Sequence, residues 1–169
     1  MKNVFKSILV SLPLGFILFA ISNTAFAGKW FPTNKINCQI WNANPQTNET
    51  ANWSGKCLNG KANGYGILLW SGGSKYIGKY SKGYMDGIGK LTWGNEEKKS
   101  VGDFYIGEFK KDFMHGEGVY TFSSGKVDEG IWNRGRLVKK KKVKDLQKRF
   151  AKIKKLIFEP NLSLQPDTQ

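Results

Sequence analysis

The feature that most constrains the fold of this chain is an internal repeat of aromatic and glycine residues. Three full copies begin at Trp53, Tyr76 and Tyr105, and a truncated fourth copy begins at Asp128, so the starts are 23, 29 and 23 residues apart. The recurring aromatic and glycine positions of the full copies are Trp53, Gly55, Gly64, Gly66, Tyr76, Gly78, Gly87, Gly89, Tyr105, Gly107, Gly116 and Gly118. A sequence that repeats at this period is built from one small unit that stacks on its neighbours.

The spacing inside each copy predicts a β-hairpin. The marked residues lie two positions apart, which places them on one face of a strand. Residues rich in Gly, Lys and Asp separate the two halves of a copy, as expected for a turn. Glycine weakens a strand unless something requires the space, so we expect a ring from the next hairpin to lie on each glycine. The middle interval is longer, and we place its extra residues in a polar loop, residues 95–103.

The repeat resembles the MORN (membrane occupation and recognition nexus) family over residues 53–135. Two positions depart from the pattern: Cys57 replaces the ring found at Tyr80, Phe109 and Trp132, and Asp128 replaces the leading aromatic residue. These departures are typical of terminal repeats. The resemblance implies an array of β-hairpins used in contacts with proteins and, in some members, with phospholipid.

The start of the chain has the layout of a secretory signal. Lys2 and Lys6 precede an uncharged apolar stretch, residues 7–22, and small residues then precede Gly28. We expect residues 1–27 to be a signal peptide that is cleaved before Gly28. The alternative is an uncleaved membrane anchor, but the apolar stretch is short for a span of about 20 residues. We therefore expect an exported protein, periplasmic or secreted, in a bacterial envelope.

Residues 28–52 form an extension before the repeats, which we expect to cover the edge of the first hairpin. An uncovered edge strand invites aggregation. The chain has two cysteines, Cys38 and Cys57, and an even number in an exported chain predicts a disulfide between them.

After the repeats, the apolar period changes to about 3.5 residues, which predicts an amphipathic helix over residues 136–158. Its apolar face is formed by Val143, Leu146, Phe150, Ile153 and Ile157. Eleven of the 27 basic residues lie within residues 136–155, in a chain of net charge +14. Residues 159–169 are expected to be a disordered tail.

The helix has two candidate partners: the open end of the repeat array, which it would cap, or an anionic membrane. The residues expected to contact an anionic surface are Lys139, Lys140, Lys141, Lys142, Lys144, Lys148, Arg149 and Lys152.

The sequence contains only weak signs of catalysis. His115 is the sole histidine and aligns with Asn63 and Asp86, which we expect at turns. Residues 55–62 approach a phosphate-binding loop but end at Ala62, which lacks the required hydroxyl. Glu96 and Glu97 lie in the polar loop beside Lys98 and Lys99, where we expect a solvated charged loop. Asp128 and Glu129 are poorly placed as paired carboxylates because neighbours on a strand point to opposite faces.

We therefore expect no catalytic residue, metal or cofactor. The predicted fold is all-β, an antiparallel meander of stacked hairpins followed by one basic amphipathic helix. The predicted function is that of a non-catalytic binding or scaffold module in the cell envelope, whose partner is a protein or an acidic envelope component. Nucleic acid is not expected. The alternatives are anionic-phospholipid binding through the helix and, ranked last, an envelope glycan-processing enzyme.

Overall fold

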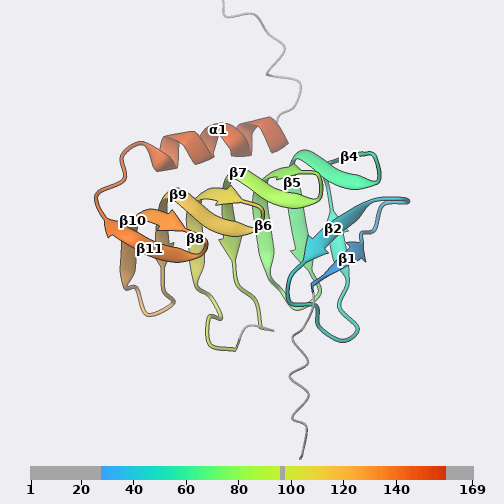
Figure 1. The fold of residues 1–169 in the computed structure, drawn as a ribbon, viewed down its shortest axis with the longest axis horizontal. Coiled ribbons are helices and arrows are strands. Elements are labelled where there is room, and N and C mark those ends of the chain that lie inside the picture. Colours follow the sequence, from blue (N-terminus) through green and yellow to red (C-terminus); the bar gives the residue numbers. More distant parts are fainter. Residues whose placement is uncertain (1–27, 96–97, 159–169) are drawn as a thin grey trace, which may run out of the picture.

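The computed structural model describes residues 28–95 and 98–158 (Figure 1). The proposed signal peptide, Glu96, Glu97 and the C-terminal tail lie outside the described residues. In chain order the elements are β1 (Lys29–Pro32), β2 (Gln39–Asn42), β3 (Ala51–Trp53), β4 (Lys56–Leu58), β5 (Lys61–Trp70), β6 (Lys75–Ser81), β7 (Tyr84–Thr92), β8 (Phe104–Lys110), β9 (Phe113–Thr121), β10 (Val127–Asn133), β11 (Arg136–Lys140) and α1 (Leu146–Phe158).

The strands of the described residues form one sheet, in which β5 to β11 follow one another as antiparallel neighbours. This arrangement confirms the predicted all-β meander. The hairpins close through two-residue turns in which both central residues have positive φ: Asn59-Gly60, Lys82-Gly83, Lys111-Asp112 and Arg134-Gly135. Such turns twist in the same sense as the strands they join, and they favour Gly, Asn and Asp.

The N-terminal extension joins the sheet beside the first hairpin. β3, which spans the end of the extension and Trp53, and β4, which lies in the first repeat, both pair antiparallel with β5, each along a different part of it. The β1–β2 hairpin meets β5 at a single parallel pair, Gln39 with Lys61. The amide of Trp41 also donates to the carbonyl of Gly83, 2.8 Å away. The extension therefore continues the sheet and does not leave β5 open to solvent.

A row of glycines crosses the sheet at the level of the leading rings. Its members pair in register from strand to strand: Gly66, Gly78, Gly89, Gly107, Gly118 and Gly130. The ring of Tyr76 lies over Gly78 and Gly89, and the ring of Tyr105 lies over Gly107 and Gly118. A side-chain carbon at these glycines would collide with the ring, which explains why the position excludes other residues.

Each ring that covers a pair of glycines comes from the same hairpin as those glycines. The prediction, which assigned the ring to the next hairpin, was wrong on this point. The hydroxyl of Tyr76 donates to the carbonyl of Lys79 (3.1 Å), and that of Tyr105 donates to the carbonyl of Glu108 (3.2 Å). These bonds hold each ring along its own strand. The next hairpin supplies a second ring that meets the first edge-on, as Phe109 does for Tyr76 with centroids 5.3 Å apart.

The C-terminal helix begins at Leu146, ten residues later than predicted. Residues Arg136–Lys140 form β11 instead, because the turn at Arg134-Gly135 returns the chain onto β10 and strand pairing satisfies its backbone groups. Within α1, Leu146, Phe150 and Ile153 are buried, in agreement with the predicted apolar face. Among the described residues no helix has the length and apolar character needed to cross a membrane.

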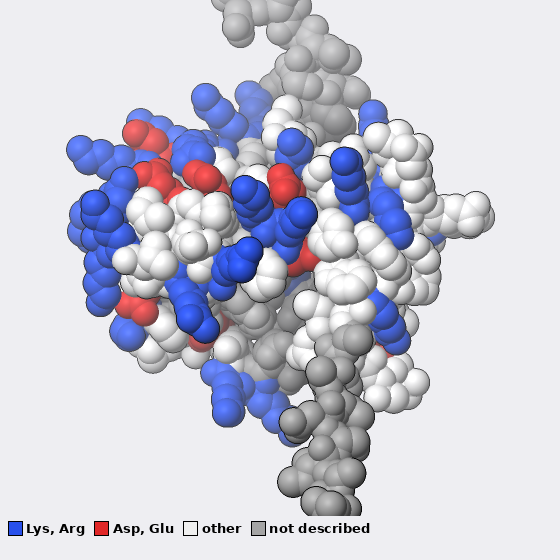
Figure 2. All heavy atoms as spheres, viewed as in Figure 1, with Lys and Arg blue, Asp and Glu red and all other residues white. Residues whose placement is uncertain are grey.

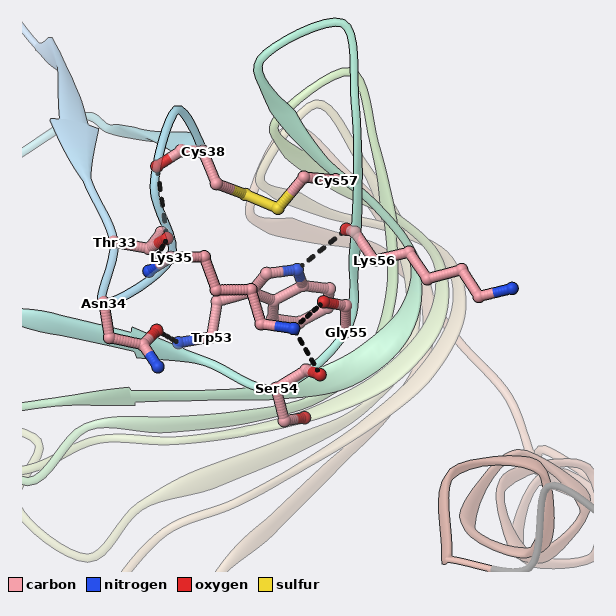
Figure 3. Close-up of a disulfide and its surroundings, with 9 residues drawn as sticks. All are labelled: Thr33, Asn34, Lys35, Cys38, Trp53, Ser54, Gly55, Lys56 and Cys57. Carbon is pink, nitrogen blue, oxygen red and sulfur yellow. Dashed lines mark hydrogen bonds between the residues drawn. A yellow bond between two sulfur atoms is a disulfide. The ribbon is translucent and has the colours of Figure 1, made fainter.

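The helix covers one face of the sheet and does not cap its last strand. It contacts β5, β6, β7 and β8 (Figure 1). Leu146 and Phe150 share a buried cluster with Ile106, against which Ile77 and Ile88 also pack. We call this the outer face, because the strands curve away from the helix (Figure 3).

Candidate binding groove

The inner face of the curved sheet carries the main core, which is largely aromatic. Trp53, Tyr76, Tyr80 and Tyr105 are at most 1% exposed. The N-terminal extension packs on the same face through Phe31 and Ile40. It leaves part of that face uncovered, and there the rings are only half-buried.

A hollow of about 230 Å³ lies where the extension ends on the inner face. Its floor comes from the sheet and includes Leu68, Tyr76 and Leu91. One wall comes from the extension and includes Trp41 and Glu49. The extension therefore defines the hollow, and the repeats alone would present an open surface.

The hollow follows the strand direction. Trp70, Ser74 and Trp93 lie at the loop end of β5, β6 and β7, whereas Met85 lies at the turn end of β7. Asp112, from the turn between β8 and β9, lines the hollow beside Met85. The hollow thus has an aromatic end at Trp70 and Trp93 and an opposite end at Met85 and Asp112.

Asp112 is the most unusual polar group of this region. Its Oδ1 accepts the amide of Met85 at 2.7 Å, while its buried Oδ2 has no hydrogen-bond partner among the described residues. Burial raises the pKa of Asp112 to about 7, and the nearby charge of Asp86 acts in the same direction. The corresponding turn position is Gly60, Gly83 or Gly135 in the other hairpins. The sequence analysis did not select Asp112, although this departure from glycine was the available signal.

The charge of the hollow is opposite to that of the chain. Glu49 and Asp112 line it, and no lysine or arginine is among the described residues that do so. The chain as a whole has 27 basic and 13 acidic residues. The hollow is therefore an acidic and aromatic site on a basic protein.

The predicted disulfide between Cys38 and Cys57 is present, with the two Cα atoms 5.8 Å apart (Figure 3). Cys38 is buried, whereas Cys57 is exposed, unlike the rings at the equivalent repeat positions. Nearby, the ammonium group of Lys35 donates to the carbonyls of Ser54 (3.1 Å) and Gly55 (2.8 Å). The bridge therefore fixes the extension to β4, and Lys35 adds contacts at the point where β3 passes into β4.

Trp53 is the leading residue of the first hairpin, and its ring packs in the same way as the rings of Tyr76 and Tyr105. It lies over Gly55 and Gly66, and its Nε1 donates to the carbonyl of Lys56 at 3.0 Å. The amide of Trp53 donates to Oδ1 of Asn34 at 2.7 Å, which ties the ring to the extension (Figure 3).

Most of the basic residues predicted to face an anionic surface have acidic partners within the protein. These ion pairs are Lys140 with Asp128, Lys141 with Glu117, Lys142 with Glu129, Lys148 with Asp145, and Arg149 with both Glu108 and Glu117. For Lys139, Lys144 and Lys152 the structure records no ion pair with a described residue. Figure 2 shows lysine and arginine side chains spread over the surface, with few acidic ones among them.

The glutamates of the outer face hold the segment that leads into α1. The ammonium group of Lys141 donates to Glu117 at 2.6 Å, and this bond lowers the pKa of that carboxyl. The amide of Val143 donates to Glu129 at 2.5 Å and lowers the pKa of Glu129 in the same way. The lysine run is therefore a structural connection between β11 and the helix as well as a source of charge.

The residues considered as weak catalytic candidates do not come together in one site among the described residues. His115 lies on β9 opposite Glu108, not at a turn, and Asn63 and Asp86 likewise lie on strands. Residues 55–62 span β4 and the turn into β5, and no helix follows them. Asp128 and Glu129 pair with different lysines, and Glu96 and Glu97 are outside the described residues. No group of three or more His, Cys, Asp or Glu side chains suited to a metal ion occurs in the described ranges.

Comparison with known proteins agrees with this architecture. The MORN repeat matches residues 58–75, 76–97 and 105–127. The chain is also similar to alsin from Homo sapiens and from Mus musculus, with 39% identity over 80 residues in each case. That stretch is 47% of this chain, and it spans only 5% of the length of those relatives. The segments 58–75, 76–97 and 105–127 of this chain are therefore MORN repeats.

Proposed function

We propose that this protein is a non-catalytic binding module that receives a segment of a partner protein in the hollow of its inner face. The observation that carries the proposal is the half-buried aromatic surface between the extension and the sheet, which includes Trp70 and Trp93. Partly exposed aromatic residues in a concave site are enriched at contacts between proteins.

The proposal is tested by capture of a partner from the native compartment with wild-type protein and two variants. Met85→Lys places a cation in the hollow, and Tyr65→Lys places one on the outer face, where the ring of Tyr65 is exposed. We expect Met85→Lys to lose the captured protein and Tyr65→Lys to keep it. Equal capture by both variants, with melting curves that show both are folded, would refute a binding site in the hollow.

We propose further that the protein is exported. The disulfide between Cys38 and Cys57 supports this, because such bridges persist in oxidising compartments. N-terminal sequencing of the native protein should begin at Gly28. Recovery of Met1 on a cytosolic protein would contradict export.

A second candidate function is attachment to anionic phospholipid by charge alone. The apolar face of α1 is buried against the sheet through Leu146, Phe150 and Ile153, so it is not available for insertion while the helix is docked. Lys144 and Lys152 remain exposed, and together with Lys155 they offer cations with no ion pair to a described residue. Each cation near such a surface contributes about 1 kcal/mol, less at high salt.

Sedimentation with phosphatidylglycerol liposomes at low and high salt tests this candidate. Changing Lys144, Lys152 and Lys155 to Gln should weaken binding at low salt more than changing Lys140, Lys141 and Lys142, which have acidic partners. Binding that is absent at low salt, or equal in the two variants, would exclude attachment through the helix.

A further inference from the structure

We propose that the hairpin turns near the end of the sheet form a docking site for an extended acidic segment of a partner protein. The site is a row of backbone carbonyls, and the N-terminal extension of this chain already occupies its first half. Binding here does not depend on the proposed use of the hollow on the inner face.

The four two-residue turns of the repeats are stacked in one geometry. Their first central residues have φ values of 46–52°, and their second central residues have values of 69–83°. The second residue of each later turn donates its amide to the strand that leaves the turn before it: Gly83 to Ala62 (2.9 Å), Asp112 to Met85 (3.1 Å) and Gly135 to Met114 (3.0 Å). Turns that share one conformation and one mutual contact point their carbonyls in the same direction. We call the carbonyls of Gly60, Gly83, Asp112 and Gly135 the turn row.

Strand β2 of the extension occupies the first half of the turn row. The amide of Gln39 donates to the carbonyl of Gly60 at 2.9 Å. The amide of Trp41 donates to the carbonyl of Gly83 at 2.8 Å. These two amides are two residues apart, so a single extended strand serves two successive turns.

The second half of the turn row is open. For the carbonyls of Asp112 and Gly135, the structure records no hydrogen-bond donor among the described residues. A segment that runs along the row as β2 does would donate one amide to each carbonyl, from residues two positions apart. Main-chain hydrogen bonds of this kind give extended peptides their affinity, and side-chain contacts at alternate positions give them specificity.

In the occupied half, the side chain at each bonded position contacts the residue that directly follows the turn. Oε1 of Gln39 accepts a hydrogen bond from the ammonium group of Lys61 at 2.8 Å. The ring of Trp41 meets the ring of Tyr84, with centroids 6.1 Å apart. The residue after each turn therefore selects the side chain that binds there.

In the open half, the residues after the turns are Phe113 and Arg136. Phe113 is 53% exposed, whereas Tyr84, its counterpart one hairpin earlier, is covered by an aromatic ring of the extension. Arg136 is exposed, and the structure records no ion pair between it and a described residue. We therefore expect an aromatic residue of the partner at Asp112 and an acidic residue two positions later, at Gly135.

A basic hollow of about 450 Å³ between the two open turns adds to the preference for an acidic segment. It is lined by Lys110, Lys111, Phe113, His115, Asn133 and Arg134. No acidic residue is among the described residues that line it, so its cations attract a partner of opposite charge, more strongly at low salt. A second copy of this chain would bring its own extension with Lys29 and Lys35, which the same cations repel.

The test is an NMR titration of the oxidised protein with the peptide acetyl-Thr-Phe-Thr-Glu-Thr-amide. We expect saturable shifts at the amides of Phe113 and Arg136, because their peptide groups contain the two open carbonyls. N-methylation of the peptide at phenylalanine and glutamate removes both donors and should weaken binding about tenfold. N-methylation of the middle threonine, whose amide points away from the row, should leave the affinity unchanged. Equal affinity for all three peptides, or the absence of saturable shifts, would overturn the proposal.

A charge exchange tests the acidic assignment. Arg136→Glu should weaken binding of the glutamate peptide severalfold and favour a peptide with lysine in place of the glutamate, as expected for an exposed ion pair. Lys99→Glu makes the same change of charge in the loop between β7 and β8 and should leave both affinities unchanged; melting curves check that both variants are folded. An unchanged preference in Arg136→Glu would refute the acidic assignment. A wild-type dimer that Arg136→Glu abolishes, seen by light scattering, would identify a second copy as the occupant and overturn the assignment to a partner protein.

Discussion

The ring of Tyr105 lies flat over Gly118 on the neighbouring strand, where a side-chain carbon would overlap the ring atoms. Tyr76 is placed in the same way over Gly89, one hairpin earlier. Both rings are almost fully buried and are held by hydrogen bonds from their hydroxyl groups to backbone carbonyls. Neither ring can move away without losing its bond, so the glycines are required by packing.

Gly118→Val and Gly89→Val should therefore destabilise the protein. Overpacking of a filled core costs about 1–3 kcal/mol, which would appear as a lower midpoint in thermal and urea unfolding. Thr121→Val is the matched control, because it introduces the same side chain on β9 at a half-buried position. Unfolding midpoints of the glycine variants that equal the control would contradict the ring-on-glycine packing.

Removal of the disulfide should lower the free energy of unfolding by an amount that depends on the number of residues in the loop it closes. Cys38 and Cys57 are 19 residues apart, and the chain-entropy relation gives about 3 kcal/mol for such a loop. The double variant Cys38→Ser, Cys57→Ser should unfold at a lower urea concentration, with the largest loss of hydrogen-exchange protection in β1 and β2. Intact mass of the native protein under non-reducing conditions provides the independent check, since two free thiols would show that the bridge does not form.

Asp112 should make the protein less stable as the pH rises from about 4 to about 7. The folded chain keeps the Asp112 proton up to a pKa of about 7, whereas the unfolded chain releases it near the ordinary value of 3.8. The folded state thus binds more protons in this range, and its stability falls with increasing pH and levels off above about pH 7. Asp112→Asn cannot titrate and should be more stable than wild type by about 1–3 kcal/mol near pH 8, with little difference near pH 4.

Urea unfolding of the two proteins at several pH values measures this difference. Glu117 and Glu129 also titrate, but at low pH and equally in both proteins, so their effect cancels. Lys111→Asn, at the other central residue of the same turn, serves as the control and should shift stability equally at every pH. A stability gap between Asp112→Asn and wild type that does not vary with pH would show that Asp112 has an ordinary pKa when folded.

Docking of α1 should depend on Phe150 and not on Phe158. Phe150 is 6% exposed and packs against the outer face, whereas Phe158 is 58% exposed. Phe150→Ala should cost about 3–5 kcal/mol if the helix and sheet unfold together, and should abolish hydrogen-exchange protection in the helix. Phe158→Ala should leave both quantities unchanged. Normal protection in Phe150→Ala would mean that the helix does not rely on this contact.

The repeat region was predictable because its signal is local. Alternating aromatic and glycine residues define strands, and the turns between them contain Gly, Asn or Asp at positions of positive φ. The disulfide was predictable because only two cysteines are present. The ring that covers each glycine was assigned to the wrong hairpin, since a period of two residues shows which face a side chain takes but not which way it lies along the strand.

The outer face and the hollow were not predictable, because both depend on residues far apart in the chain. Arg149 pairs with Glu108, which lies 41 positions earlier, and Lys141 pairs with Glu117, 24 positions earlier. The run of basic residues in 136–155 gives no sign of these partners, so its lysines were predicted to contact an anionic surface. Similarly, the end of the hollow that contains Asp112 forms only when β7 brings Met85 beside the turn between β8 and β9.

The position of α1 changes how the array should respond to force and heat. Repeat arrays whose units touch only their neighbours can fray one unit at a time from either end. Here a single helix contacts β5, β6, β7 and β8, so it links successive hairpins to one another. The Cys38–Cys57 bridge joins the N-terminal extension to the first hairpin. Because the helix links successive hairpins and the bridge links the extension to the first of them, the protein should unfold as one cooperative unit.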